Sequence, residues 1–284
     1  MTGIGLPDRD DLLRVVRTAL EEDLRYGPDA TTAATVAEDA VAVGAFTPRA
    51  PGVLAGAPVV TAVLDEVLGS GYELVSALAD GSRLVPGEPA IVVRAPVRGL
   101  LTAERTALNL LCHLSGVATA TRAWVDAVAG TGATIRDTRK TLPGLRLLEK
   151  YAVRCGGGVN HRLGLGDAVL IKDNHVAPAG SVSAALAAAR AAAPDLPCEI
   201  EVDSLEQLDD VLGLGAELVL LDNFGPAETA EAVRRRGDRA TLLESSGGLV
   251  LANAAEYAAT GVDFISVGGL THSVTALDLG LDLG

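Results

Sequence analysis

Apolar residues change their spacing along this chain, and each change predicts a different kind of element. Over residues 10–20 they recur at helical intervals, which predicts an amphipathic helix. From about residue 46 to residue 97, short apolar runs alternate with Gly and Pro turn signals, a pattern typical of short antiparallel strands. Helical spacing returns over residues 102–114. We therefore expect the first part of the chain to form an α/β sandwich domain.

After residue 130 the pattern becomes apolar strand, polar strand end and helix, repeated. The predicted strands cover residues 133–137, 168–172, 199–203, 218–222, 241–244 and 264–267. Helical stretches over residues 181–193, 205–212, 227–235 and 252–260 lie between them. Six successive strand-helix units favour a parallel sheet. Nearly every strand ends in polar residues, which favours an incomplete TIM-like α/β barrel over an open sheet, because barrel strand ends meet at one mouth.

Charge separates one segment from the rest of the chain. The formal net charge is -14, which argues against a nucleic-acid partner, since phosphate backbones are bound through basic surface. Residues 136–172 nevertheless contain eight Lys or Arg against three Asp or Glu, and all three lysines of the chain lie there. A local basic island suits a small polyanionic ligand held in a pocket.

Composition and cysteine usage bear on location. Neither a basic leader followed by an apolar run nor a membrane-spanning stretch is recognisable, so we expect no membrane association. Cys112, Cys155 and Cys198 lie far apart and include no CxxC pair, which favours a reducing cytoplasm.

Acidic residues at two predicted strand ends are candidates for metal binding. Strand alternation places Glu199, Glu201 and Asp203 on one face of their strand, and Asp222 ends the next one. Mg²⁺ prefers one or two carboxylates plus substrate oxygens, so we assign Glu201 and Asp222 to the metal and to catalysis. For Asp203 we instead expect a cap on the following helix.

Two glycine-rich turns are candidates for phosphate binding. Ser245-Ser246-Gly247-Gly248 and Ser266-Val267-Gly268 each follow an apolar strand and precede a helix. Glycines there let backbone N–H groups approach a phosphate. One such turn alone is weak support, but the last two strands of barrels often share a phosphate site.

Basic residues near the ends of the predicted strands are candidates for binding carboxylates and phosphates. Thr138, Arg139 and Lys140 follow one strand, and Lys172 follows another. Arg162 could pair with a carboxylate, while His161 is explained equally well as a structural histidine. The chain has no GxxxxGK or GxGxxG motif and no zinc-ligand spacing, so ATPase, Rossmann and zinc-enzyme functions lose their main support.

Several motifs resemble one family, and together they cover nearly the whole chain. Residues 136–175, RDTRKTLPGLRLLEKYAVRCGGGVNHRLGLGDAVLIKDNH, resemble the central motif of the quinolinate phosphoribosyltransferases. So do EDLRYGPDATT, LTAERTALNLLCHLSG, EIEVDSLEQL, LLDNF, LESSGG and GVDFISVGGLTHS.

The resemblance implies a fold and an assembly. It implies a sandwich domain over residues 1–114, an incomplete barrel over residues 115–270 and a C-terminal segment, 271–284, that packs back on the first domain. It also implies a homodimer in which Arg105 crosses to the partner's site and binds quinolinate together with Arg139, His161 and Arg162. Lys140 and Lys172 would lie between quinolinate and phosphoribosyl pyrophosphate and act as catalytic residues, and His272 would assist.

The implied reaction is phosphoribosyl transfer to quinolinate with loss of CO₂, giving nicotinate mononucleotide and pyrophosphate in NAD biosynthesis. Mg²⁺ on Glu201 and Asp222 would serve the ribose and the leaving group. Three alternatives stay open: a Schiff-base lyase using Lys140 or Lys172, a phosphoribosyltransferase acting on another base, and a non-catalytic sensor of phosphoribosyl pyrophosphate.

Overall fold

A computed structural model describes residues 4–284, which divide into two compact units. The sandwich unit contains the described residues up to Arg122 together with Thr141–Gly157 and Leu270–Gly284. The barrel unit contains Ala123–Lys140 and Gly158–Gly269. Each unit is described by itself below.

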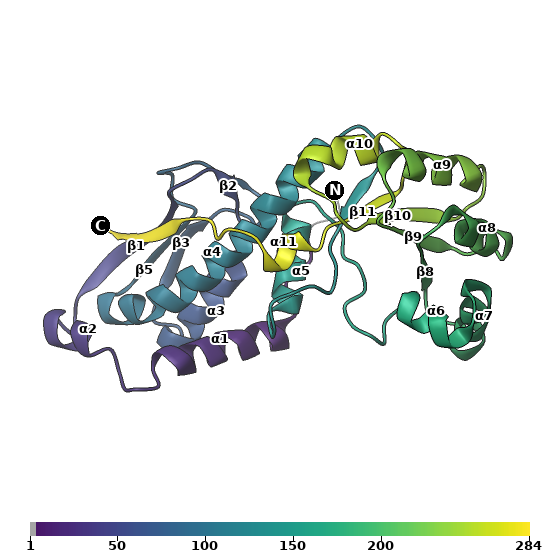
Figure 1. The fold of residues 1–284 in the computed structure, drawn as a ribbon. Coiled ribbons are helices and arrows are strands. Elements are labelled where there is room, and N and C mark those ends of the chain that lie inside the picture. The colour runs from purple at the N-terminus through teal and green to yellow at the C-terminus, as the bar shows by residue number, and fades with distance from the viewer. Residues whose placement is uncertain (1–3) are drawn as a thin grey trace. The chain divides into compact units, whose positions relative to one another are not determined.

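The sandwich unit is built on an antiparallel four-stranded sheet (Figure 1). Its strands, in the order β12-β1-β5-β3, are β12 (Leu279–Leu283), β1 (Val41–Pro48), β5 (Ile91–Pro96) and β3 (Glu73–Ala77). A second, two-stranded sheet pairs β2 (Gly52–Val53) with β4 (Arg83–Leu84). The helices are α1 (Arg9–Asp23), α2 (Ala30–Thr35), α3 (Ala57–Leu68), α4 (Val97–Ala127) and α5 (Arg146–Cys155).

Helix α3 corrects the expectation that residues 46–97 form strands only. Its buried positions Val59, Val60, Val63 and Leu64 recur at helical spacing, so one stripe of the helix enters the core. The backbone N–H groups of Gly56 and Ala57 donate to the Asp80 carboxylate at 2.8 and 3.0 Å. A distant side chain therefore satisfies the helix start, which local spacing could not reveal.

Helix α4 is longer than the sequence pattern predicts. We expected a helical run over residues 102–114, whereas the helix extends from Val97 to Ala127. The expected domain boundary after residue 114 falls inside it, and the compact units divide within the same helix after Arg122. The helical segment α5 also belongs to the sandwich unit, although it follows the first barrel strand in the chain.

The C-terminal segment belongs to the sandwich unit. Strand β12 pairs antiparallel with β1 and forms the edge of the sheet, where it is drawn in yellow in Figure 1. Before β12, the backbone N–H of Leu277 donates to Cys112 O on α4 at 2.9 Å. A Cβ built on Gly116 would meet Thr275 O at 2.4 Å, so α4 needs glycine where the C-terminal segment crosses it.

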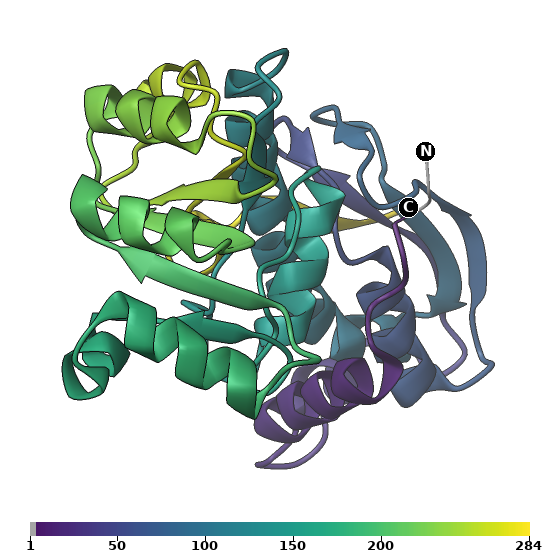
Figure 2. The same cartoon turned by 90° about the vertical axis from the view of Figure 1, so that its right-hand side faces the viewer.

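The barrel unit contains six parallel strands, as the sequence predicts. They are β6 (Thr134–Arg136), β7 (Val169–Ile171), β8 (Cys198–Val202), β9 (Leu218–Asp222), β10 (Leu242–Ser246) and β11 (Phe264–Ser266). The helical segments are α6 (Asp173–Ala179), α7 (Val182–Ala192), α8 (Leu205–Gly213), α9 (Pro226–Arg236), η1 (Leu251–Asn253) and α10 (Ala254–Ala258), followed by α11 (Gly269–His272) at the return to the sandwich unit. The green helices and strands of this unit are viewed from another side in Figure 2.

The strand order identifies an incomplete barrel. It runs β6-β11-β10-β9-β8-β7, so successive strands are neighbours from β7 to β11 and the first strand joins the last. This is the cyclic order of an α/β barrel, with a gap between β6 and β7 in place of a closing pair. A doubly wound open sheet reverses its order at a switch point, and no reversal occurs here.

One expected helix cap lies one residue from its predicted position. Strand β8 ends at Val202, Asp203 is exposed, and Ser204 caps α8 by accepting from the backbone N–H of Gln207. The prediction that Asp203 caps this helix is therefore wrong, since the serine hydroxyl occupies the capping position.

Among residues 4–284, the structure contains no helix with both the length and the apolar character needed to cross a bilayer.

Candidate active site

A cavity of about 570 Å³ opens in the barrel unit. It contains twelve of the residues that the sequence predicts for the site: Thr138, Arg139, Lys140, His161, Arg162, Lys172, Glu201, Asp222, Ser246, Gly247, Gly248 and Ser266. Its volume is within the range of small-molecule sites. The structure therefore brings together residues that are up to 128 positions apart, from Thr138 to Ser266.

Strand register explains how these residues meet. Asp222 of β9 lies beside Ser246 of β10, and Ser266 of β11 lies beside Arg136 of β6. Two residues earlier on β9 and β10, Leu220 lies beside Glu244, and Glu201 of β8 lies beside Leu220. Because alternate strand residues face the same side, each row of neighbours forms one layer of the cavity.

Two arginines supply fixed cationic groups to one wall. Arg162 Nη1 donates to Ala168 O at 3.0 Å, which holds this guanidinium against the chain. Burial and the nearby charge of Arg139 lower the pKa of Arg162. The Nε atoms of Arg139 and Arg162 are buried, and no group in residues 4–284 accepts a hydrogen bond from them. Two such donors at a cavity wall fit an anionic ligand with several acceptor oxygens.

The two site lysines differ in their surroundings. Lys172 follows β7, and its Nζ forms an ion pair with the carboxylate of Glu201. Lys140 is exposed, and a Cβ built on Gly268 would lie 2.8 Å from Lys140 Cδ. In this structure Gly268 therefore leaves space for the stem of Lys140.

A strained turn forms a second part of the cavity wall. Asn223 has a φ of 60°, the only positive value at a non-glycine residue in the described chain, and its N–H donates to Ser246 O at 2.9 Å. Its side-chain nitrogen donates to Asp222 Oδ2 at 2.8 Å. Gly247 and Gly248 follow with φ values of 90° and 62°. Successive glycines in this conformation can present backbone N–H groups to an anion.

Asp222 and Glu201 provide carboxylate oxygens that fit a divalent cation. Both side chains line the cavity and neither is fully buried. Mg²⁺ is usually bound by one or two carboxylates, with waters and substrate oxygens completing its shell. Asp222 is the freer of the two, because the Glu201 carboxylate already binds the Lys172 ammonium.

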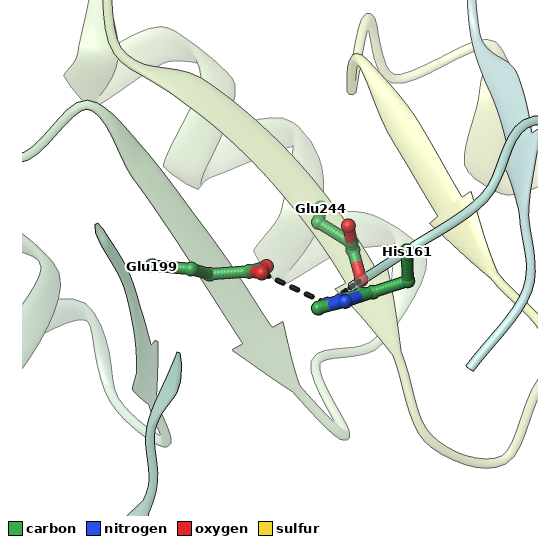
Figure 3. A group of neighbouring side chains, drawn as sticks. All are labelled: His161, Glu199 and Glu244. Carbon is green, nitrogen blue, oxygen red and sulfur yellow. Dashed lines mark ion pairs between the residues drawn. The ribbon is translucent and has the colours of Figure 1, made fainter. Parts of the chain in front are cut away.

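His161 lies between two buried carboxylates (Figure 3). Its Nε2 is 2.9 Å from Glu199 Oε2 and 3.8 Å from Glu244 Oε1. Its Nδ1 accepts the backbone N–H of Arg162 at 2.7 Å. Burial and the charge of Glu199 raise the pKa of Glu244, although Arg136 Nη1 lies 2.6 Å from Glu244 Oε2 and opposes that rise. Both ring nitrogens of His161 are thus directed at the protein.

Some expected site residues lie outside the cavity. Ser245 is buried and alternates with lining residues on β10, so it faces the other side of the sheet, and Val267, which directly follows β11, is buried outside the cavity lining. Arg105 is exposed on α4 in the sandwich unit. His272 is also exposed, with its Nδ1 2.6 Å from Ser273 Oγ.

Four lining residues were not predicted: Leu170, Leu220, Asn223 and Glu244. Strand alternation could have identified two of them, because Leu220 has the parity of Asp222 and Glu244 has the parity of Ser246. Asn223 lines the cavity because its backbone is left-handed. Asparagine tolerates this conformation better than most residues, but nothing else in the sequence predicts it.

Comparison with known proteins identifies the family. Two family models match: the quinolinate phosphoribosyl transferase N-terminal domain over residues 29–115 and the corresponding C-terminal domain over residues 117–282. The chain is 65% identical over 271 residues to the nicotinate-nucleotide pyrophosphorylase (carboxylating) of Mycobacterium leprae, covering 94% of this chain and 95% of that protein.

Similarity extends to more distant relatives and to solved structures. The human nicotinate-nucleotide pyrophosphorylase (carboxylating) is 40% identical over 278 residues, covering 96% of this chain and 91% of the human protein. The structure of the nicotinate-nucleotide pyrophosphorylase from Francisella tularensis superposes with a TM-score of 0.93 at 36% identity and covers 100% of both chains. The chain therefore belongs to the quinolinate phosphoribosyl transferase family.

Proposed function

We propose that this chain transfers a phosphoribosyl group from phosphoribosyl pyrophosphate to quinolinate, with loss of CO₂, as a step of NAD biosynthesis. One observation carries the proposal: a single cavity joins a wall of guanidinium groups to a wall of carboxylates and left-handed glycines. The first wall suits a dicarboxylate, and the second suits a ribose phosphate. Family membership supports the same assignment.

Quinolinate would bind against Arg139 and Arg162. Guanidinium groups bind carboxylates through two parallel N–H donors, and the buried Nε atoms of both arginines are available for such a pair. Lys172 lines the same cavity, and its ammonium would turn from Glu201 toward the ring carboxylates when the base enters.

Phosphoribosyl pyrophosphate would bind at the second part of the cavity wall. The turn through Ser246, Gly247 and Gly248 is suited to the 5′-phosphate, and Asp222 to the ribose. We assign Mg²⁺ to Asp222 and Glu201, where it would neutralise charge on the departing pyrophosphate.

The chain's own charges would then promote bond cleavage. When the C1–O bond to pyrophosphate breaks, positive charge develops on the ribose, and the carboxylates of Asp222 and Glu201 stabilise it. Lys140 lies across Gly268 and would stabilise the negative charge on the leaving oxygen. Quinolinate, held by the arginines, presents its nitrogen to C1, and the new C–N bond forms with little proton transfer.

Decarboxylation follows from the charge on the ring. Ribosylation makes the ring nitrogen cationic, so the electron pair of the bond between C2 and its carboxylate stays on C2 as CO₂ departs. A proton from solvent then completes nicotinate mononucleotide. The part played by the protein is positioning and charge stabilisation.

We further propose that the protein works as a homodimer in the cytoplasm. Arg105 is exposed on α4, which suits a side chain that completes the partner's site. The three cysteines are free thiols, and such thiols persist in a reducing compartment.

A related enzyme that uses nicotinate is the second candidate, and substrate profiling separates the two. Purified protein would be incubated with Mg²⁺, phosphoribosyl pyrophosphate and either quinolinate or nicotinate. We expect nicotinate mononucleotide from quinolinate alone, because a base lacking the 2-carboxylate leaves a guanidinium unpaired. Product from nicotinate alone would overturn the base assignment, and no product from either would favour a sensor.

A further inference from the structure

Buried charged side chains form a cluster in the barrel unit (Figure 3), and two of them, His161 and Glu244, also line the cavity. His161, Glu199 and Glu244 are 8%, 4% and 0% exposed, and Arg136 completes the set through its 2.6 Å contact with Glu244. The members come from three strands, β6, β8 and β10, and from the segment between α5 and β7. Burying two carboxylates is costly unless each has a partner, so these two carboxylates depend on the cationic groups around them.

The protonation of His161 argues against a metal ion between these three side chains. Because Nδ1 accepts the N–H of Arg162 at 2.7 Å, the ring proton of neutral His161 is on Nε2, which faces Glu199. A metal ion bound to Nε2 would have to displace that proton, which would leave the ring without a proton on either nitrogen. Arg136 already occupies one oxygen of Glu244. The cluster is therefore a network of buried ion pairs, in which Glu199 Oε1 and Glu244 Oε1 accept no hydrogen bond from residues 4–284.

His161 also connects this cluster to the cavity wall that contains Arg139 and Arg162. Its backbone N–H donates to Asp137 Oδ1 at 2.7 Å, and its ring accepts from Arg162 at the next position. Asp137 immediately precedes Thr138, Arg139 and Lys140. Arg162 is held at its far end by Ala168. The imidazole of His161 thus binds the backbone at Arg162, and the backbone of His161 binds Asp137 in the segment that carries Arg139.

We propose that Glu199 and Glu244 are positioning residues for the base. They hold the imidazole of His161, and through it Arg162, in the orientation in which the two arginines bind the dicarboxylate. Neither carboxylate needs to contact quinolinate. The proposal rests on the proposed function and assigns to that site two residues whose task is specificity for the dicarboxylate.

Steady-state kinetics of four variants test it. Glu199→Gln and Glu244→Gln keep the volume but remove the charge, and Glu199→Leu also removes the polar atoms that lie beside Nε2 of His161. Glu149→Gln is the matched control, because Glu149 is 0% exposed and pairs with His113 at 2.8 Å in the sandwich unit. We expect the KM for quinolinate to rise about tenfold in Glu199→Leu and less in Glu199→Gln, which keeps a polar side chain beside the imidazole.

The two substrates separate positioning from general damage. Glu244→Gln should also raise the KM for quinolinate, while the KM for phosphoribosyl pyrophosphate stays near the wild-type value in all variants. Glu149→Gln should lower the melting temperature without changing the ratio of the two KM values. Calorimetric binding of quinolinate to the folded fraction gives the same comparison if Glu199→Leu folds poorly.

The possible results are distinct. An unchanged KM for quinolinate in folded Glu199 and Glu244 variants overturns the proposal, and so does an equal rise in both KM values. If the wild-type protein binds phosphoribosyl pyrophosphate but does not use quinolinate, the proposed function fails instead.

Discussion

The turn through Asn223, Gly247 and Gly248 has a strained backbone, which the contacts around the cavity can maintain. Asn223 adopts a left-handed backbone, and its side-chain oxygen occupies the space that a side chain at Gly247 would need. Such conformations persist only where surrounding contacts enforce them, and they gather at functional sites. The carboxylate of Asp222 is held by the same asparagine at 2.8 Å, so the strained turn also orients a proposed metal ligand.

Gly247→Ala should therefore damage the proposed phosphate site. A Cβ there would lie 2.2 Å from Asn223 Oδ1, so we expect a loss of ~1–3 kcal/mol in the free energy of unfolding and a raised KM for phosphoribosyl pyrophosphate. Gly248→Ala is the control, since its φ is 62° but no atom lies within 4 Å. Denaturant titration and kinetics should show the larger effect at Gly247, and equal effects would contradict this account of the turn.

At the residue scale, the sequence predicted the residues that line the outer part of the cavity better than those of its inner layer. Period-two alternation correctly placed Glu201 and the neighbouring apolar residues on opposite faces of β8. The predicted phosphate-binding turn, however, included Ser245, which faces away from the cavity. It did not include Glu244, which lines the cavity. Applying strand parity to every residue of each motif would have removed both errors.

Among the elements, α4 and the C-terminal segment depend on close backbone approach. Helical pattern alone predicted part of α4, and it gave no indication that residues 275–277 cross the helix at Gly116. The sequence also failed at α3, where a valine-rich run resembles a strand but the start is satisfied by Asp80. Tertiary contacts decided both elements, which is why local spacing could not.

Gly116→Ala tests the crossing. Alanine favours a helix over glycine by about 1 kcal/mol, so helix propensity alone predicts stabilisation. The new Cβ would instead lie 2.4 Å from Thr275 O and 3.1 Å from Ala276 Cα, and we expect a net loss of ~1–3 kcal/mol. Gly99→Ala, in the same helix, meets only the flexible end of Leu68 at 2.1 Å and should be tolerated better. Thermal unfolding that ranks the two variants in the opposite order would refute the crossing.

Helix α9 gives a prediction about acid. Hydrogen bonds from Arg234 and Arg235 lower the pKa of Glu231 from 4.5 to about 2. A carboxyl group whose pKa is lowered in the folded state stabilises the protein at pH values above its ordinary pKa. That contribution is lost as the pH falls from 4.5 through about 2. An NMR titration of the Glu231 carboxyl carbon should show this low midpoint, and replacing both arginines with alanine should raise it. A midpoint near 4.5 in the unmodified protein would contradict the pairing, which is exposed and contributes little to stability at neutral pH.

On the scale of the whole molecule, the proposed homodimer is an assembly that a single chain does not display. The cavity in the barrel unit contains Arg139 and Arg162, whereas Arg105 is exposed in the sandwich unit. The sequence predicted the two-domain α/β fold and the barrel strands. It could not predict that residues 141–157 return to the sandwich unit, because that placement depends on contacts between segments distant in the chain.

Arg105→Ala should preserve the fold and sharply reduce the use of quinolinate. The side chain is exposed, so its removal should leave the melting temperature close to that of the unmodified protein. To test whether the arginine acts across a dimer, Arg105→Ala and Lys172→Ala would be unfolded, mixed in equal amounts and refolded together. Half of the random dimers would then contain one subunit of each variant, and each mixed dimer would have one intact site of its two. We therefore expect about a quarter of wild-type activity. Full inactivity of the mixture, with both parents folded and dimeric, would place Arg105 outside the partner's site.

The fate of the two carboxylates of quinolinate is the most direct test of the proposed reaction. Quinolinate carrying ¹³C in either the 2- or the 3-carboxylate would be incubated with the protein, phosphoribosyl pyrophosphate and Mg²⁺. We predict that label from position 2 appears in CO₂ in step with pyrophosphate release, while label from position 3 stays in nicotinate mononucleotide. Retention of both labels in a ribosylated product, or CO₂ released without pyrophosphate, would contradict coupled transfer and decarboxylation at this site.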